Sequence, residues 1–184
     1  SNMIIFYFSG KVVLNLFGKD KFIKVFIIGL LSGSITYLLS YNIFPVFSGL
    51  KPSMIGASAG VMAVFIFLAS YSPNYTFRFI IFDVKIIYLA LILIAMDLIQ
   101  IPVGNSGGHL AHLGGAAWGY YYCSQVKRGN DTGQWVINFM EYLKGLFLKK
   151  RNVNKVYKRK NYKPTHKTSV DQQKIDLILD KISV

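Results

Sequence analysis

This chain has little cysteine and shows no signal peptide. Cys123 is the only cysteine among 184 residues, so an internal disulfide is excluded and the redox compartment cannot be inferred. We expect Cys123 to be a small buried residue. The chain enters an apolar stretch directly after Ser1-Asn2-Met3, without the charged leader and small-residue cleavage site of a signal peptide. The sequence therefore looks like part of a longer protein.

Charge is nearly missing from the first two thirds of the chain. The formal net charge is +13, but 14 of the 21 Lys and Arg lie after Val126. With 53% hydrophobic and 15% aromatic residues, the chain is too apolar for an ordinary soluble domain. These features predict two parts, a transmembrane domain over residues 1–126 and a basic cytoplasmic tail over residues 127–184.

Five apolar blocks can be drawn in the first part, at residues 3–17, 22–41, 58–71, 86–101 and 108–126. A hydrocarbon core of about 30 Å needs about 20 helical residues, so the second and fifth blocks are long enough to span it. The block that begins at Ser58 is short. Because unpaired backbone groups cannot face lipid, a helix that starts at membrane depth must border other helices or a wet cavity. The expected fold is all-α, a polytopic transmembrane helical bundle.

The charges between the blocks predict the orientation of the bundle. Lysine and arginine gather in the connections between blocks one and two, between blocks three and four, and after block five, which makes those ends cytoplasmic. The connections at residues 42–57 and 102–107 contain a single lysine, Lys51, and are expected outside. Ser58 and His112 both lie at this outer side, and the loops beside them are candidates for substrate access.

The basic tail has its own pattern. Residues 134–150 carry apolar side chains in a helical arrangement ending in Lys149-Lys150-Arg151, which favours a helix on the membrane surface. Residues 151–170 are basic and polar and are expected to be disordered, and a short amphipathic helix begins near Ile175. We expect anionic lipid headgroups as the partner of the tail and not nucleic acid, because no nucleic-acid-binding motif is present.

Ser58 and His112 are the candidate catalytic residues. A serine hydroxyl becomes a nucleophile when a neutral imidazole takes its proton, and a helix start supplies free N–H groups that hold an oxyanion. Taken alone, Gly56-Ala57-Ser58-Ala59-Gly60 is better explained as a helix-packing motif of small residues. A histidine inside a membrane span is costly and by default functional, and this favours the catalytic interpretation.

Three glycines are candidates for close helix packing: Gly56, Gly115 and Gly119. The last two lie one and two turns after His112 on the same helical face, so the last helix can approach a partner closely. Such an approach is what a contact between imidazole and hydroxyl requires.

The pattern Ala-His-x-x-Gly-x-x-x-Gly, formed by Ala111, His112, Gly115 and Gly119, together with the upstream Gly-x-Ser that contains Ser58, resembles the rhomboid family of intramembrane serine proteases. The resemblance covers residues 1–126, and five of the six core helices of the family are present. It implies a Ser58–His112 dyad that cleaves transmembrane segments, without a metal or organic cofactor, and a location in a bacterial cytoplasmic membrane. It also implies that Asn2 shares the oxyanion with the Ser58 N–H, since Asn2 matches the asparagine of a family motif whose histidine and first helix would precede this chain.

Two other ionisable residues lie near the dyad in sequence. Asp97 is interpreted as a capping or loop-binding residue and not as an orienting partner of His112. His109 could share a helical face with His112, but no His-Glu-x-x-His pattern or third ligand is evident, so a zinc protease is not expected. His109 is instead predicted to line the cavity or to help bind the oxyanion.

Two alternatives stay open. A catalytically inactive rhomboid-like protein would bind transmembrane helices, although such relatives typically lack the serine or the histidine. A small transporter or channel would use His112 as a proton relay and needs polar residues at mid-depth on several helices, where Ser32, Ser34 and Thr36 are nearly all that this chain offers. The oligomeric state cannot be read from the sequence.

Overall fold

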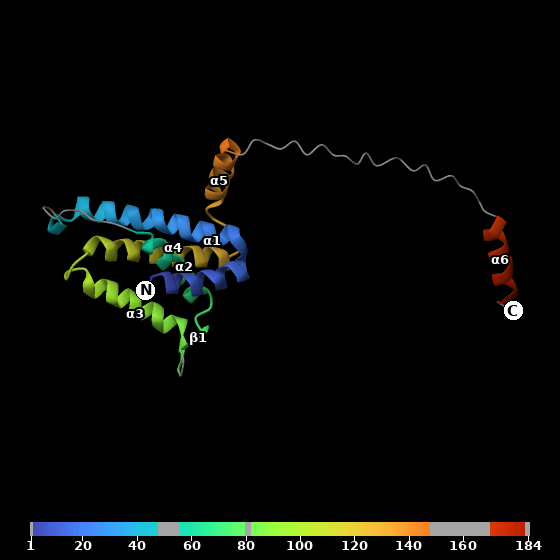
Figure 1. The fold of residues 1–184 in the computed structure, drawn as a ribbon, viewed down its shortest axis with the longest axis horizontal. Coiled ribbons are helices and arrows are strands. Elements are labelled where there is room, and N and C mark those ends of the chain that lie inside the picture. The colour runs from blue at the N-terminus through green and yellow to red at the C-terminus, as the bar shows by residue number, and fades with distance from the viewer. Residues whose placement is uncertain (1, 48–55, 80–81, 148–169, 183–184) are drawn as a thin grey trace. The chain divides into compact units, whose positions relative to one another are not determined.

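The computed structural model describes residues 2–47, 56–79, 82–147 and 170–182 of the chain. It divides into two compact units, Ser1–Lys149 and Lys150–Val184. The first unit contains the elements α1 Asn2–Ile43, the 3-10 turn η1 Pro45–Phe47, α2 Ser58–Tyr71, β1 Thr76–Phe79, β2 Phe82–Lys85, α3 Ile86–Gln100, α4 Ser106–Lys127 and α5 Gln134–Phe147. The expected all-α helical bundle is confirmed, with each apolar block forming a helix or helix arm (Figure 1).

Helix α1 is a hairpin of two arms. Gly18 has φ 80° and ψ 175°, a conformation that costs glycine little because it has no Cβ. The chain reverses there, and the two arms run side by side (Figure 1). Phe6 on the first arm contacts Phe22 and Phe26 on the second, with ring centroids 5.7 Å and 5.1 Å apart. The first two apolar blocks therefore form separate helix arms that pack against each other.

Helix α2 is the centre of the bundle. Every residue from Ala59 to Ala69 is buried, because α1 packs on one side and α4 on another. Small residues make these contacts close: a Cβ on Gly29 or Gly33 of α1 would meet the side chain of Ala63 or Ala59. Ser32 adds a hydrogen bond from its hydroxyl to the Gly114 carbonyl at 2.8 Å. Packing of small residues is the main source of helix association in a bilayer.

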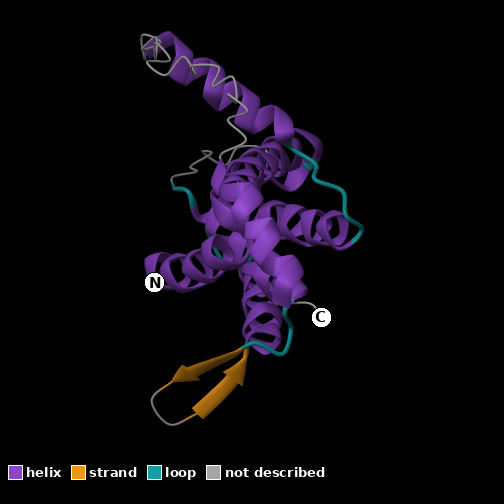
Figure 2. Ribbon diagram, turned by 90° about the vertical axis from the view of Figure 1, so that its right-hand side faces the viewer, coloured by secondary structure: helices purple, strands orange, loops and turns teal. Residues whose placement is uncertain are grey.

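A two-stranded hairpin connects α2 to α3, and the sequence patterns did not indicate it. Strands β1 and β2 pair antiparallel with Thr76 opposite Lys85 and Phe77 opposite Val84 (Figure 2). Each strand is only four residues long. The hairpin also follows an apolar block for which we expected helical periodicity. The hairpin leads directly into α3, whose first residue Ile86 donates its N–H to the Tyr75 carbonyl at 2.8 Å.

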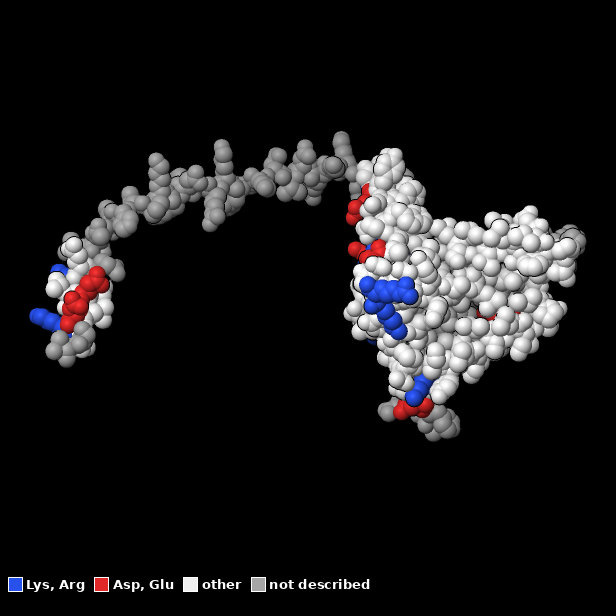
Figure 3. All heavy atoms as spheres, turned by 180° about the vertical axis from the view of Figure 1, so that it is seen from behind, with Lys and Arg blue, Asp and Glu red and all other residues white. Residues whose placement is uncertain are grey.

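Charged side chains gather at one end of the first unit. Figure 3 shows Lys and Arg together beside α5, while the rest of the visible face of the bundle is almost uncharged. Exposed residues at this end include Lys19 next to the α1 turn and Lys127 and Arg128 at the end of α4. Among the described residues, α1 is long and apolar enough to cross a membrane, and α2 and α3 are shorter apolar helices. The distribution matches the cytoplasmic side that the charge pattern predicts.

Helix α5 belongs to the first compact unit, Ser1–Lys149. Lys24 of α1 is 1% exposed and donates hydrogen bonds to Asp131 at 2.9 Å and to Gln134 at 2.7 Å. Val136 and Ile137 of α5 are also buried. These contacts tie the start of the tail to the bundle. In the second unit, α6 Val170–Ile182 forms the expected terminal helix, while residues 151–169 lie outside the described part of the chain.

Candidate active site

Ser58 is the first residue of α2, which is shorter than the neighbouring α4. Helix α2 has 14 residues, a length of about 21 Å, whereas the 22 residues of α4 extend about 33 Å. The preceding residue, Ala57, has no side-chain group that caps the helix, and its φ and ψ are −92° and 17°. The N–H groups of the first turn are thus not satisfied by a side-chain cap.

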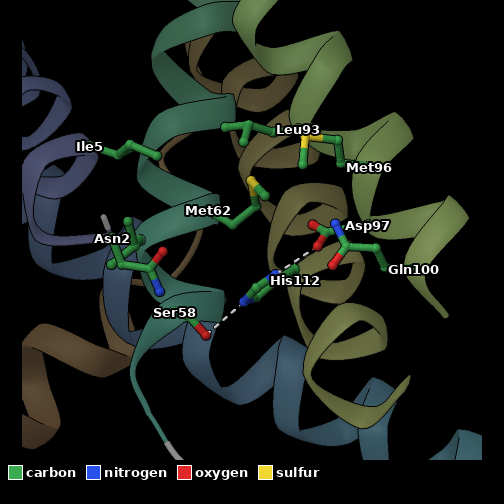
Figure 4. A pocket seen from close by; sticks show the side chains of 10 residues that line it. Asn2, Ile5, Ser58, Met62, Leu93, Met96, Asp97, Gln100 and His112 are labelled. Carbon is green, nitrogen blue, oxygen red and sulfur yellow. Dashed lines mark hydrogen bonds and ion pairs between the residues drawn. The ribbon is translucent and has the colours of Figure 1, made fainter. Parts of the chain in front are cut away.

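The structure brings Ser58 and His112 into contact. The Ser58 Oγ and the His112 Nε2 are 2.7 Å apart (Figure 4), a hydrogen bond in which the hydroxyl donates and the imidazole accepts when the ring proton is on Nδ1. His112 lies on the second turn of α4, and the two helices meet because Gly115 and Gly119 face the backbone carbonyls of Ala59 and Ala63. The structure places both glycines against the backbone of α2.

Gly56 does not have the helix-packing role that we expected. A Cβ added there would meet no atom within 4 Å, and the residue has φ 125°. Gly56 therefore forms the turn before α2 and not a helix-packing surface. In the same small-residue motif it is Gly60 that packs against a neighbouring helix, with Phe26 and Leu30 of α1 against its Cα.

Asp97 corrects the interpretation drawn from the sequence. It lies on α3, with its side chain 9% exposed, and its Oδ1 accepts a hydrogen bond from the His112 Nδ1 at 3.0 Å. The carboxylate therefore holds the imidazole ring, an orienting contact and not a cap or loop contact. The sequence signal was present, since Asp97 is an acidic residue in an apolar span, but spacing along the chain does not show that α3 faces His112.

His109 contacts the same carboxylate. Its Nδ1 is 2.7 Å from the Asp97 Oδ1, and its side chain is 12% exposed. We expected His109 to line the cavity or to help bind the oxyanion. It is not among the residues that line the two cavities at Ser58. The statement that no third metal ligand accompanies the two histidines is also wrong, because Asp97 completes a group of three potential ligands.

Two cavities meet at Ser58. One of about 110 Å³ extends between α1 and α3, lined by Asn2, Ile5, Ser58, Val61, Met62, Leu93, Met96, Asp97, Gln100 and His112. The other, of about 190 Å³, opens toward the outer loops and is lined by Asn2, Leu30, Ser34, Gly56, Ser58, Ala59, Asn105, Gly108, Ala111 and His112. Asn2 lines both, and Figure 4 shows it on the opposite side of Ser58 from His112.

This arrangement has the chemistry of a serine hydrolase. A hydroxyl donates to an imidazole, the imidazole donates to a buried carboxylate, and a helix start without a side-chain cap lies at the hydroxyl. The same relay of nucleophile, base and orienting group occurs on unrelated folds and is recognised by its geometry. Here it is built entirely from helices of an apolar bundle.

Comparison with known proteins agrees with the geometry. A family model described as "Rhomboid domain" matches residues 1–128, so the chain belongs to the rhomboid family. It is 33% identical over 143 residues to "RHOMBOID-like protein 12, mitochondrial" of Arabidopsis thaliana, a match that covers 70% of this chain. The chain spans 42% of the length of that relative. No solved structure matches the chain.

Proposed function

We propose that this chain is an intramembrane serine endopeptidase that hydrolyses peptide bonds in or near transmembrane segments of other proteins. The observation that supports this most directly is the 2.7 Å contact between the Ser58 Oγ and the His112 Nε2 inside an apolar bundle. Family membership gives the substrate environment, since rhomboid proteins reside in the bilayer. A bacterial cytoplasmic membrane remains the predicted location, and the named relative is mitochondrial.

The proposed reaction begins with proton transfer from Ser58 to His112. The Oγ attacks the carbonyl carbon of the scissile bond while its proton moves to Nε2, and the Asp97 carboxylate stabilises the imidazolium through the Nδ1–H. The imidazolium then gives that proton to the leaving amine. A water molecule then attacks the acyl-enzyme, His112 takes a proton from the water, and it returns that proton to the Ser58 Oγ as the acyl group leaves.

We propose that the oxyanion of the reaction forms at the start of α2. The backbone N–H of Ser58 is one donor, and the Asn2 side chain is the other, because both residues line the two cavities. Donors aimed at the charge that develops in the transition state contribute most of the electrostatic stabilisation in such sites. The absence of a side-chain cap at Ala57 leaves these N–H groups available.

The two cavities are proposed as separate access routes for substrate and for water. The smaller cavity lies between α1 and α3 and is lined mainly by apolar side chains such as Ile5 and Leu93, which suits a substrate segment that arrives from the lipid. The larger one reaches the outer loops at Gly56 and Asn105 and supplies water. A substrate must have a helix end that unwinds there, because an intact helix hides its peptide bonds.

Helix α5 is proposed to lie on the cytoplasmic membrane surface. It stands across the direction of α1, α2 and α4 (Figure 1), and its exposed side chains include Trp135, Phe139 and Tyr142. Such a helix inserts its apolar side chains at the headgroup boundary. The basic residues of the following tail are expected to contact anionic headgroups.

A fluorophosphonate probe, which reacts with activated serine hydroxyls, tests the proposal. The full chain should be labelled in detergent micelles, Ser58→Ala should abolish labelling, and His112→Ala should lower its rate by about 10²-fold to 10⁴-fold, the usual contribution of a general base. Ser70→Ala is a matched control, because Ser70 lies at the other end of α2 and its variant should label at the normal rate.

The same experiment separates the proposal from an inactive rhomboid-like protein. Labelling of the same extent in the parent chain, Ser58→Ala and His112→Ala would show that the dyad is not the reactive group. Absence of labelling in a correctly folded parent chain would favour the inactive, helix-binding alternative. Cleavage of a reconstituted transmembrane substrate, lost in Ser58→Ala, would extend the result from reactivity to proteolysis.

A further inference from the structure

Asp97, His109 and His112 form a compact group of metal-binding side chains beside the nucleophile. One ligand atom from each lies within 4.8 Å of the others. Both histidines direct Nδ1 at the Asp97 Oδ1, at 2.7 Å and 3.0 Å. The second oxygen, Oδ2, is buried and has no hydrogen-bond partner among the described residues. The mechanism above uses the contact of Asp97 with His112 and explains neither His109 nor the unpaired oxygen.

We propose that these three side chains form an inhibitory zinc site, in which Zn²⁺ binds the Nδ1 atoms of His109 and His112 and the carboxylate of Asp97 and stops hydrolysis. The inhibitory part rests on the function proposed above, whereas zinc binding itself does not. Two imidazoles and one carboxylate are a donor set that suits zinc, while calcium and magnesium prefer oxygen ligands.

The two Nδ1–Oδ1 separations are close to those around a bound ion. Zinc–ligand bonds of about 2.0–2.1 Å in a tetrahedron separate neighbouring ligand atoms by about 3.3 Å. The Nδ1–Oδ1 distances of 2.7 Å and 3.0 Å therefore need to open by a few tenths of an ångström, as the ion takes the place of the two hydrogen-bond protons. The unpaired Oδ2 offers an alternative or additional ligand atom. Asp97 and His112 also line the cavity of about 110 Å³, which leaves room for water at a fourth position.

Zinc binding and catalysis exclude each other through the imidazole of His112. A neutral imidazole carries one ring proton, and in the catalytic form it is on Nδ1, so that Nε2 accepts the proton of Ser58. Coordination uses the Nδ1 lone pair and places the ring proton on Nε2. The Nε2–H then points at the Ser58 Oγ, 2.7 Å away, and can only donate to it. The nucleophile loses its base with only small shifts of the side chains.

Direct binding measurements test the site without using activity. Isothermal titration of the purified full chain with zinc chloride should show one site, and Ser58→Ala should bind zinc equally well because Ser58 is not a ligand. His109→Ala should weaken the affinity by at least about tenfold, since even outer-shell changes at metal sites cost 10-fold to 100-fold. His166→Ala removes a histidine outside the described residues and serves as the matched control, with unchanged affinity expected.

Probe labelling in the presence of zinc tests the inhibition. Labelling of Ser58 in the parent chain should fall as zinc occupies the site and should return after a chelator is added. For His109→Ala, the zinc concentration that lowers labelling by a given fraction should be at least about tenfold higher than for the parent chain. Zinc affinity unchanged in His109→Ala, or undiminished labelling at zinc concentrations that saturate the site, would overturn the inference. Absence of labelling without zinc would instead contradict the proposed function, and titration of Ser58→Ala would still test the site.

Discussion

The two sides of the candidate site are held in different ways. Ser58 and His112 belong to helices that pack backbone to backbone, with Gly115 and Gly119 against the carbonyls of α2. Asp97 belongs to α3, of which only Ile86, Ala90 and Asp97 are buried. Most other side chains of α3 are exposed apolar residues, and these include Leu91, Ile92, Met96, Leu98 and Ile99.

The two sides of the candidate site therefore have different roles. The packing of α2 against α4 sets the distance between hydroxyl and imidazole and leaves it little freedom, because close-packed backbones cannot shift without losing contacts. Helix α3 carries the carboxylate that orients the imidazole and also borders the cavity that faces α1. A displacement of α3 would therefore remove the orienting contact while the Ser58–His112 pair stays together.

Overpacking the α2–α4 contact should have the largest effect. Gly115→Leu places a side chain where the Ala59 carbonyl lies, so α2 and α4 must separate, at a cost of about 1–3 kcal/mol or more. We expect a lower unfolding midpoint in detergent and loss of probe labelling. Ala95→Leu is the control, since Ala95 is exposed on α3. Equal midpoints for the two variants would contradict the rigid packing of α2 against α4.

Removal of the orienting charge should come next. Asp97→Asn keeps a hydrogen-bonding group of the same size, but its amide does not stabilise the imidazolium. We expect probe labelling and kcat to fall by about 10-fold to 10²-fold, the range for a misplaced catalytic group, which corresponds to at most about 2.7 kcal/mol. The effect should appear in kcat with KM nearly unchanged.

Two measurements separate positioning from structural loss at Asp97. The thermal unfolding midpoint of Asp97→Asn should stay close to that of the parent chain, because α3 buries few side chains. Asp97→Glu should recover part of the lost rate, as it restores the charge. A kcat that is unchanged in Asp97→Asn would show that His112 acts without this carboxylate.

The smallest expected effect lies at the other end of the bundle. Burial raises the pKa of Asp131, but hydrogen bonds from Lys24 and Tyr122 and the charge of Lys24 outweigh burial and hold the pKa below its usual value of 3.8. The folded state therefore gains stability that is fully present above that value and is lost as the pH falls through the lower, folded-state pKa. Because the Asp131 side chain is 44% exposed, this contribution is about 1 kcal/mol or less.

Unfolding in detergent as a function of pH measures this contribution. The parent chain should lose stability below about pH 4, and Asp131→Asn should remove part of that pH dependence. Asp20→Asn changes an exposed acidic residue near the α1 turn and should leave the curve unchanged. A curve for Asp131→Asn that is parallel to that of the parent would mean that the Lys24–Asp131 pair contributes nothing.

Several features of the fold and site could be predicted from the sequence because they depend on local patterns. The apolar blocks predicted the helices, and the glycines one and two turns after His112 predicted the face of α4 that packs closely. The β1–β2 hairpin was missed because four-residue strands give little periodic signal. Asp97 was misread because the helices α3 and α4 meet through a loop whose length does not fix which residues face each other.

The sequence by itself determined that this chain forms an apolar helical bundle with a serine and a histidine at the ends of its apolar blocks, since hydropathy and charge are properties of the residues alone. Only the tertiary structure decided that Asp97 and His109 join them, because side chains on three helices converge through packing. A rotation of α3 about its axis by one residue, about 100°, would leave the hydropathy pattern unchanged and change which side chain meets His112. For this reason the dyad was predictable, and the carboxylate and the proposed zinc site were not.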